Sequence, residues 1–125
     1  MSGRSKPLIV LVDDEPAFLS LISRWLERDY EVKSFTSGEG VYEAMGELKP
    51  DLVVLDVHMQ PMDGYELCRR IRSDSRFDLT SVLFLTGAKS DADLVRQIEA
   101  GGSGFLNKPI DPQELRRVIA EELAA

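Results

Sequence analysis

The stretch "LIVLVDDEP" at residues 8–16 places two adjacent carboxylates and a proline directly after five apolar residues. A short, continuous run of Leu, Ile and Val is typical of a strand buried on both faces, as in a parallel sheet. Asp13 and Asp14 therefore stand where this strand ends. Because like charges repel at such short range, the pair needs a physical reason, such as a cation held nearby.

The same pattern recurs along the chain. "LVVLDV" at 52–57 and "VLFLT" at 82–86 predict two more buried strands, while "EVKSF" at 31–35 predicts an edge strand and "GFLN" at 104–107 a short one. Between these runs, apolar residues recur at helical spacing, and we interpret each stripe as core packing. The stripes are Phe18, Leu21, Ile22, Trp25 and Leu26; Val41, Ala44, Met45 and Leu48; Leu67, Cys68 and Ile71; Leu94, Val95 and Ile98; and Leu115, Val118, Ile119 and Leu123.

Five strands alternating with five helices predict an α/β fold, and right-handed crossovers favour a doubly wound parallel sheet. The 125 residues are a usual length for one domain. The sequence contains no internal repeat, low-complexity segment or interdomain linker. We therefore expect a single domain over residues 1–125, with its core at about residues 7–124.

Composition narrows the function classes. A net charge of −7 argues against binding to nucleic acid or to an anionic membrane, both of which need a basic face. No apolar run approaches the roughly 20 residues of a membrane span, and "MSGRSKP" at the start lacks the apolar stretch of a secretory signal. The single cysteine, Cys68, fits a reducing cytoplasm, and its helical position suggests a core residue.

Polar side chains stand at the end of each strong strand. Asp13 and Asp14 follow the first strand, Asp56 lies at the end of the third, Thr86 closes the fourth, and Lys108 follows the fifth. Ligands of open α/β sheets bind outside the carboxyl ends of the strands. We therefore expect these side chains to form one site.

The residue types at this edge indicate phosphoryl chemistry. Three carboxylates in one pocket favour a hard cation such as Mg²⁺, because no His or Cys side chain is among the ligands. Lys108 supplies a positive charge and Thr86 a hydroxyl group, and both suit an anionic oxygen. A carboxylate in such a setting can itself be the nucleophile and form an aspartyl phosphate.

Four motifs carry a family resemblance: "VDDEP", "DLVVLDVHMQPMDGYELCRRIR", "VLFLTG" and "AGGSGFLNKPIDPQEL". In order and spacing, over essentially the whole chain, they resemble the receiver domain of bacterial two-component response regulators. The resemblance implies a flavodoxin-like fold with strand order 2-1-3-4-5. It also implies a cytoplasmic, phosphorylation-driven signalling switch, which is not an enzyme beyond promoting its own phosphorylation and dephosphorylation.

The resemblance further implies that Asp56 accepts a phosphoryl group from a sensor histidine kinase, a phosphotransfer protein or a small phosphodonor. Asp14 and Asp56 would bind Mg²⁺ directly, together with the backbone carbonyl of His58. Asp13 would act mainly through water. The His58 side chain would lie at the rim of the pocket, and we interpret it as a solvated loop residue rather than a group that orients water.

The remaining motif residues would sense the phosphate. By resemblance, Lys108, Thr86 and Gly87 bind it, Thr86 swings toward it, and Phe105 turns inward as Thr86 moves. Lys108–Pro109 would be a cis peptide. The face made of the fourth helix, fifth strand and fifth helix would then change and regulate a downstream effector domain or protein, with a homodimer as one possible active form.

The chain departs from the family pattern in two places. Gln60 stands where relatives usually have proline, with Pro61 one position later, although Asp63 and Gly64 still fit a helix start. Ser103 and Gly104 replace two acids that precede the switch aromatic in many relatives. One of those acids helps build a symmetric dimer in the winged-helix subfamily.

Other function classes share some of these groups. A phosphatase of the haloacid dehalogenase type would need Asp two residues after its nucleophile, where this chain has His58, and it would need a cap domain. A flavodoxin-like flavin binder would need a Ser/Thr-rich loop after the first strand, and the acids of "DDEP" would repel the flavin phosphate. A receiver-like module that is no longer phosphorylated is a further alternative.

Overall fold

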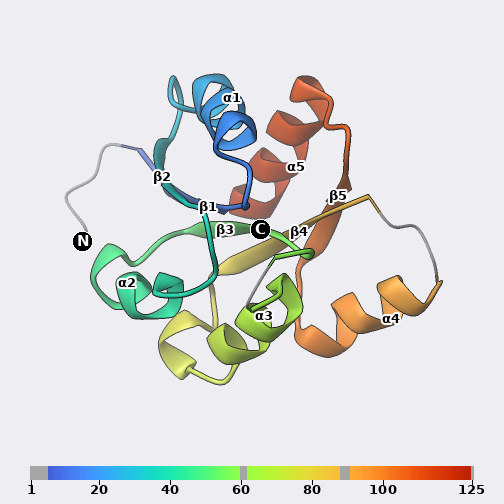
Figure 1. Cartoon of the computed structure of the whole chain (residues 1–125). Coiled ribbons are helices and arrows are strands. Elements are labelled where there is room, and N and C mark those ends of the chain that lie inside the picture. Colours follow the sequence, from blue (N-terminus) through green and yellow to red (C-terminus); the bar gives the residue numbers. More distant parts are fainter. Residues whose placement is uncertain (1–5, 60–61, 88–90, 125) are drawn as a thin grey trace.

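In a computed structural model, which describes residues 6–59, 62–87 and 91–124, strands and helices alternate along the chain (Figure 1). The elements are β1 (Leu8–Val12), α1 (Pro16–Leu26), β2 (Glu31–Phe35), α2 (Val41–Leu48), β3 (Leu52–Asp56), α3 (Gly64–Arg72), a short 3₁₀ helix η1 (Ser75–Phe77), β4 (Ser81–Thr86), α4 (Asp91–Ala100), β5 (Gly104–Asn107) and α5 (Pro112–Ala124). All five predicted strands are confirmed, with bounds within one residue of those expected.

The five strands form one parallel sheet in the order β2-β1-β3-β4-β5. Helices α1 and α5 cover one face, and α2, α3 and α4 cover the other (Figure 1). The α/β class, the doubly wound arrangement and the expected strand order are therefore confirmed. Strand β2 lies at the edge of the sheet, as its mixed sequence predicts.

Alternate residues of the inner strands fill two separate cores. On β1, Val10 and Val12 join the core beneath α2 and α3, while Ile9 and Leu11 join the core beneath α1 and α5. Successive side chains of a strand point to opposite faces, and here both faces are covered. This is the physical reason why the inner strands read as unbroken apolar runs.

Two of the helical stripes contain residues that do not pack in the core, although Phe18, Ile22, Trp25 and Leu26 on α1 do so as predicted. On α1 the buried face runs through Leu19, whereas Leu21 is 45% exposed. On α4, Val95 is 51% and Ile98 74% exposed, so these two side chains do not pack in the core, and the side chain of Leu94, the third residue of this stripe, lies outside the described part of the chain. Helical spacing shows that apolar residues share a face, but it does not show whether that face meets the sheet.

Two local predictions hold. Cys68 is buried, its thiol donates to the Ala100 carbonyl at 3.2 Å, and burial raises its pKa to about 11, so it behaves as a core residue. Asp63 caps α3, since its side chain accepts a hydrogen bond from the Glu66 N–H at 2.9 Å.

The departure from the family pattern at Gln60 and Pro61 lies outside the described residues. No described helix combines the length and apolar character that a membrane span requires.

Candidate functional site

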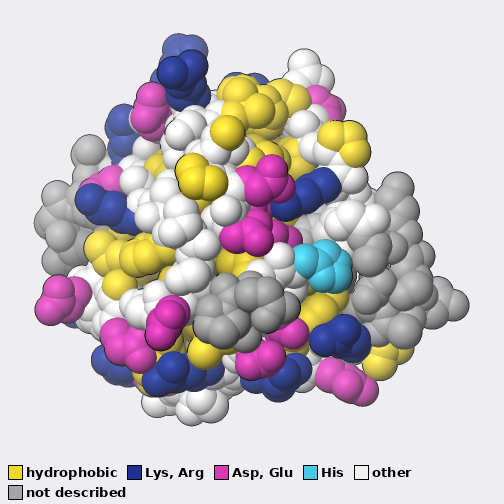
Figure 2. Space-filling model, in the orientation of Figure 1, with side chains coloured by type: hydrophobic (Ala, Val, Ile, Leu, Met, Phe, Trp, Pro, Cys, Tyr) yellow, Lys and Arg dark blue, Asp and Glu magenta, His cyan; other side chains and the backbone are white. Residues whose placement is uncertain are grey.

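The polar residues at the carboxyl edge of the sheet come together as the sequence predicts. The ammonium nitrogen of Lys108 lies 2.8 Å from Oδ2 of Asp13 and 3.6 Å from Oδ2 of Asp56. Asp13 is completely buried and Asp56 nearly so. Figure 2 shows acidic side chains gathered on this face, with a basic side chain and the histidine beside them. One cation is therefore shared by carboxylates from two neighbouring strands.

The local backbone fixes each carboxylate. Oδ1 of Asp56 accepts the backbone N–H of His58 at 3.1 Å, and Oδ1 of Asp13 accepts the N–H of Glu15 at 3.0 Å. In both residues Oδ2 is the oxygen that faces Lys108. The histidine side chain itself is exposed, so the contact that His58 makes with Asp56 runs through its backbone.

Helix α3 begins against the end of β3. A Cβ atom on Gly64 would lie only 2.5 Å from the backbone oxygen of Asp56, closer than real Cβ contacts come. Glycine therefore permits the first turn of α3 to approach the strand end that carries Asp56. This close approach explains the "MDG" segment in physical terms.

Burial and charge shift the pKa of Asp56. Burial is the largest cause and raises this pKa, and the nearby negative charges of Asp13 and Asp14 add to the rise. The His58 N–H and the Lys108 ammonium oppose the rise, but the net direction is upward. The carboxylates of this pocket thus repel one another, as expected from the sequence.

Lys108 remains a cation in this setting. Burial lowers its pKa, but the hydrogen bond to Asp13 and the attraction of Asp56, Asp13 and Glu15 outweigh burial, so its pKa is raised. A group whose pKa already lies far above neutrality and rises further stays protonated at neutral pH. The pocket therefore holds a permanent positive charge next to Asp56.

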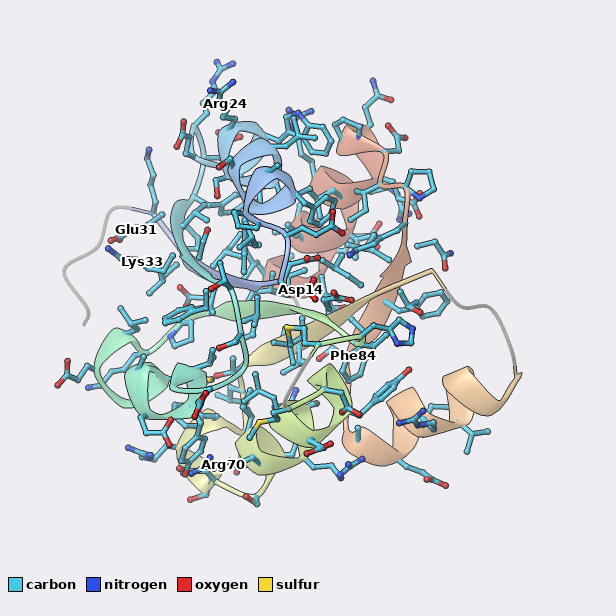
Figure 3. All side chains as sticks on the ribbon, viewed as in Figure 1. Asp14, Arg24, Glu31, Lys33, Arg70 and Phe84 are labelled. Atoms are coloured by element: carbon cyan, nitrogen blue, oxygen red, sulfur yellow. The ribbon has the colours of Figure 1, made fainter. Side chains whose placement is uncertain are left out.

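The acids fit the ligand preferences of Mg²⁺. In the described part of the chain, carboxylate oxygens of Asp13, Asp14 and Glu15 all lie within 4.8 Å of one another. Asp14 lies just beyond the end of β1 and is exposed (Figure 3). Hard cations prefer such oxygen donors. The sequence interpretation placed Asp13 and Asp14 here but did not include Glu15, whose proximity follows from its place directly after them.

Thr86 and Gly87 occupy the same edge. The Thr86 side chain is buried at the end of β4, and its backbone carbonyl accepts the N–H of Lys108 at 2.9 Å. Gly87 follows and is exposed, and among the described residues no atom lies within 4 Å of the position that a Cβ would take. The Lys108–Pro109 peptide bond is cis, as the resemblance implies. These residues are thus adjacent to the acids.

Phe105 lies two residues before the end of β5 and pairs in register with Phe84. Its side chain is 41% exposed, so it faces outward in this structure. Its inward movement is a change between states and stays a prediction.

Phe18 lies near Lys108, but the sequence pattern assigns it only to the core. The ammonium nitrogen of Lys108 lies 4.7 Å from the ring centroid of Phe18, a residue of α1. Helical spacing correctly places Phe18 against the core beneath α1 and α5. No signal in the sequence separates a ring that only packs on the core from one that also faces a lysine.

Comparisons with known proteins agree on one family. The family profile described as "Response regulator receiver domain" matches residues 9–120. The transcriptional regulatory protein GltR of Pseudomonas aeruginosa is 36% identical over 115 residues, which cover 91% of this chain and 46% of GltR. The chain therefore spans about half the length of this relative.

Solved structures give the same result. The chemotaxis protein CheY4 of Vibrio cholerae matches with a TM-score of 0.89 at 25% identity, covering 94% of this chain and 98% of CheY4. The BeF₃-activated N-terminal receiver domain of RstA from Klebsiella pneumoniae matches with a TM-score of 0.86 at 30% identity, covering 94% of this chain and 99% of that domain. Among the function classes considered from the sequence, these likenesses favour the signalling switch.

Proposed function

The chain belongs to the response regulator receiver domain family, and from this premise we propose that Asp56 accepts a phosphoryl group and so operates a signalling switch. The observation that carries the proposal is the shared cation: Lys108 lies 2.8 Å from Asp13 and 3.6 Å from Asp56. A fixed positive charge beside a buried carboxylate suits an incoming phosphoryl oxygen.

Asp56 is the best nucleophile among the three acids. Both carboxylate oxygens of Asp13 already accept a hydrogen bond, from Lys108 and from the Glu15 N–H. Asp14 is exposed, and among the described residues the ion pairs of Lys108 are with Asp13 and Asp56, not with Asp14. Oδ2 of Asp56 lies 3.6 Å from the ammonium nitrogen of Lys108, which is beyond hydrogen-bond distance. This oxygen therefore faces a cation but accepts no hydrogen bond from it.

The reaction transfers one phosphoryl group. An Oδ lone pair of Asp56 attacks phosphorus, and the bond from phosphorus to the donor breaks in line with the attack. With phosphohistidine the leaving imidazole nitrogen takes up a proton, and with acetyl phosphate the leaving group is acetate. The product is an acyl phosphate on Asp56, and hydrolysis of that bond returns the carboxylate and inorganic phosphate.

Mg²⁺ belongs to the same proposal. Asp14 and Asp56 would hold the ion with the backbone carbonyl of His58, and Asp13 would act mainly through water. When bound, the ion would neutralise charge on the transferring phosphoryl oxygens. Two observations support this assignment. Carboxylate oxygens of Asp13 and Asp14 lie within 4.8 Å of each other. Burial is the largest cause of the raised pKa of Asp56, and the charges of Asp13 and Asp14 add to the rise, so both acids lie near Asp56.

The chain itself supplies the remaining steps. Lys108 would bind a phosphoryl oxygen, as would the hydroxyl group of Thr86 and the backbone of Gly87. The movement of Thr86 would let Phe105 turn inward and change the face of α4, β5 and α5. The charge and the acceptor oxygens that the phosphoryl group adds would favour the changed state of this face.

The partners and the location follow from the family. A sensor histidine kinase or phosphotransfer protein would donate the phosphoryl group. An effector domain or protein would respond to it, because the matched relative GltR is a transcriptional regulatory protein and this chain covers only 46% of its length. A homodimer is a possible active form. A cytoplasmic location fits the one buried, unpaired cysteine. The domain would turn over no substrate other than its own aspartyl phosphate.

The test is covalent labelling followed by intact mass spectrometry. Wild type incubated with acetyl phosphate and Mg²⁺ should gain one phosphoryl group that acid or base treatment removes. Asp56→Asn should gain none, while Asp78→Asn, which changes an exposed acid after η1, should label like wild type. Equal labelling of wild type and Asp56→Asn would overturn the proposal.

A further inference from the structure

The lysine of the pocket has a partner that is not an acid. The Lys108 ammonium nitrogen lies 4.7 Å from the centroid of the Phe18 ring, over its face. We propose that Phe18 is a positioning residue, which holds the ammonium of Lys108 at the phosphoryl pocket before and during transfer to Asp56. This inference rests on the function proposed above and names a residue of this chain that serves it.

Phe18 is held where it can do this. It lies in the first turns of α1, which begins at Pro16 directly after the acids. Its ring packs on the core beneath α1 and α5 and is only partly buried, so one side is fixed by the core while the face remains open to Lys108. A Phe side chain has only two rotatable bonds, and a packed ring keeps its orientation.

Two features of Lys108 leave its ammonium incompletely fixed. Its side chain has a flexible four-carbon stem, and it is 24% exposed, so solvent competes for the ammonium. The attraction between a cation and the face of an aromatic ring lowers the cost of keeping the ammonium partly out of water.

The ring differs from the two acids in one decisive respect. Asp13 and Asp56 are the charged partners of Lys108, but both are candidate metal ligands and Asp56 is the reacting group. Their hold on the lysine must therefore change during the reaction. The Phe18 ring carries no charge, binds no Mg²⁺ and takes no phosphoryl group, so its contact with Lys108 can persist through every state.

The decisive comparison is a double-mutant cycle on the rate of labelling by acetyl phosphate with Mg²⁺. A small donor is used because a kinase could also touch α1. Phe18→Leu keeps an apolar side chain without a ring. It should label about fivefold more slowly than wild type, because without one cation–π contact the ammonium of Lys108 is in place for a smaller fraction of the time. Phe18→Tyr keeps the ring and should restore most of the wild-type rate.

The cycle is closed in a Lys108→Met background. There Phe18→Leu should change the rate by less than about twofold, because the cation that the ring holds is absent. Equal losses in the two backgrounds, or no loss in either, would show that Phe18 serves only as packing and would overturn the inference. Should Phe18→Leu unfold, Phe18→Met takes its place, since it fills a similar volume without a ring.

A second readout needs neither metal nor phosphate. Protons on the ε-carbon of Lys108 should show an upfield ring-current shift in the NMR spectrum of the metal-free protein. The shift should disappear in Phe18→Leu and remain in Phe18→Tyr, and an ε-proton shift that is the same in all three proteins would overturn the inference. This readout keeps the two proposals apart, because wild type that shows the shift but takes no phosphoryl group would contradict only the proposed function.

Discussion

The ammonium nitrogen of Lys108 lies 2.8 Å from Oδ2 of Asp13, and this ion pair joins the residue after β1 to the residue after β5. Asp13 is completely buried, whereas the Lys108 side chain is partly exposed. A buried carboxylate is costly unless a partner compensates its charge. The pair therefore has a structural role in addition to any role in phosphoryl transfer.

Removing the cation should destabilise the fold. Lys108→Met keeps the length and apolar stem of the side chain but leaves Asp13 buried without its cation. We expect a loss of about 2 kcal/mol in the free energy of unfolding, below the usual cost of breaking a fully buried pair, because Lys108 is partly exposed. Urea unfolding in EDTA measures it. Lys33→Met, on the exposed edge strand, should change stability by less than about 0.5 kcal/mol, and equal midpoints for the two variants would contradict the pairing.

The raised pKa of Asp56 should make the free energy of unfolding depend on pH. Because the pKa is raised in the folded state, the folded protein binds more protons than the unfolded chain between the ordinary value of 3.8 and the folded value. Stability that wild type owes to this group is thus present at low pH and is lost as pH rises through that window. In EDTA, the advantage of Asp56→Asn over wild type should grow from about pH 4 upward and then level off. An advantage that is constant with pH would contradict the shift.

Mg²⁺ should stabilise wild type more than Asp56→Asn. An ion that binds only the folded protein stabilises it by about 2.7 kcal/mol at a hundredfold excess over its dissociation constant. Wild type should gain this amount, while Asp56→Asn, which lacks one of the proposed ligands, should gain clearly less. Four urea melts measure the effect: each protein with EDTA and with Mg²⁺. The metal assignment fails if both proteins gain equally or if neither gains.

Thr86 should couple the phosphate to Phe105. Thr86→Ala removes the hydroxyl group but leaves Asp56 and Lys108 in place, so the variant should accept a phosphoryl group without moving the Phe105 ring. Two-dimensional NMR of the phosphorylated proteins compares the resonances around Phe105. Thr86→Ser, which keeps the hydroxyl group, serves as the control. Phosphorylation-induced shifts of wild-type size in Thr86→Ala would refute the coupling.

Much of this architecture is predictable from the sequence. The inner strands are covered on both faces, so Val10 and Ile9 can both be apolar, and an unbroken apolar run marks the strand. In a parallel sheet every carboxyl end lies at one edge, so residues far apart in the chain, such as Asp13 and Lys108, can be placed together without knowing any distance.

The parts that could not be predicted depend on how helices rotate about their axes. On α4, Ala100 is buried, and the guanidinium of Arg96 lies 4.4 Å from the centroid of the Tyr65 ring although this side chain is 53% exposed. The more apolar pair, Val95 and Ile98, is exposed instead. A long arginine can pack its stem and plane on a ring while it stays exposed to water, so residue polarity alone does not show which side chains of a helix contact the rest of the fold.

Reductive trapping identifies the residue that carries the phosphoryl group, which we propose to be Asp56. Wild type is incubated with acetyl phosphate and Mg²⁺ and then treated with borohydride, which reduces an acyl phosphate to the corresponding alcohol. Peptide mass spectrometry then locates the modified residue. We expect homoserine at position 56, and only in samples that received both donor and Mg²⁺. Homoserine at position 13 or 14, or at no position, would contradict it.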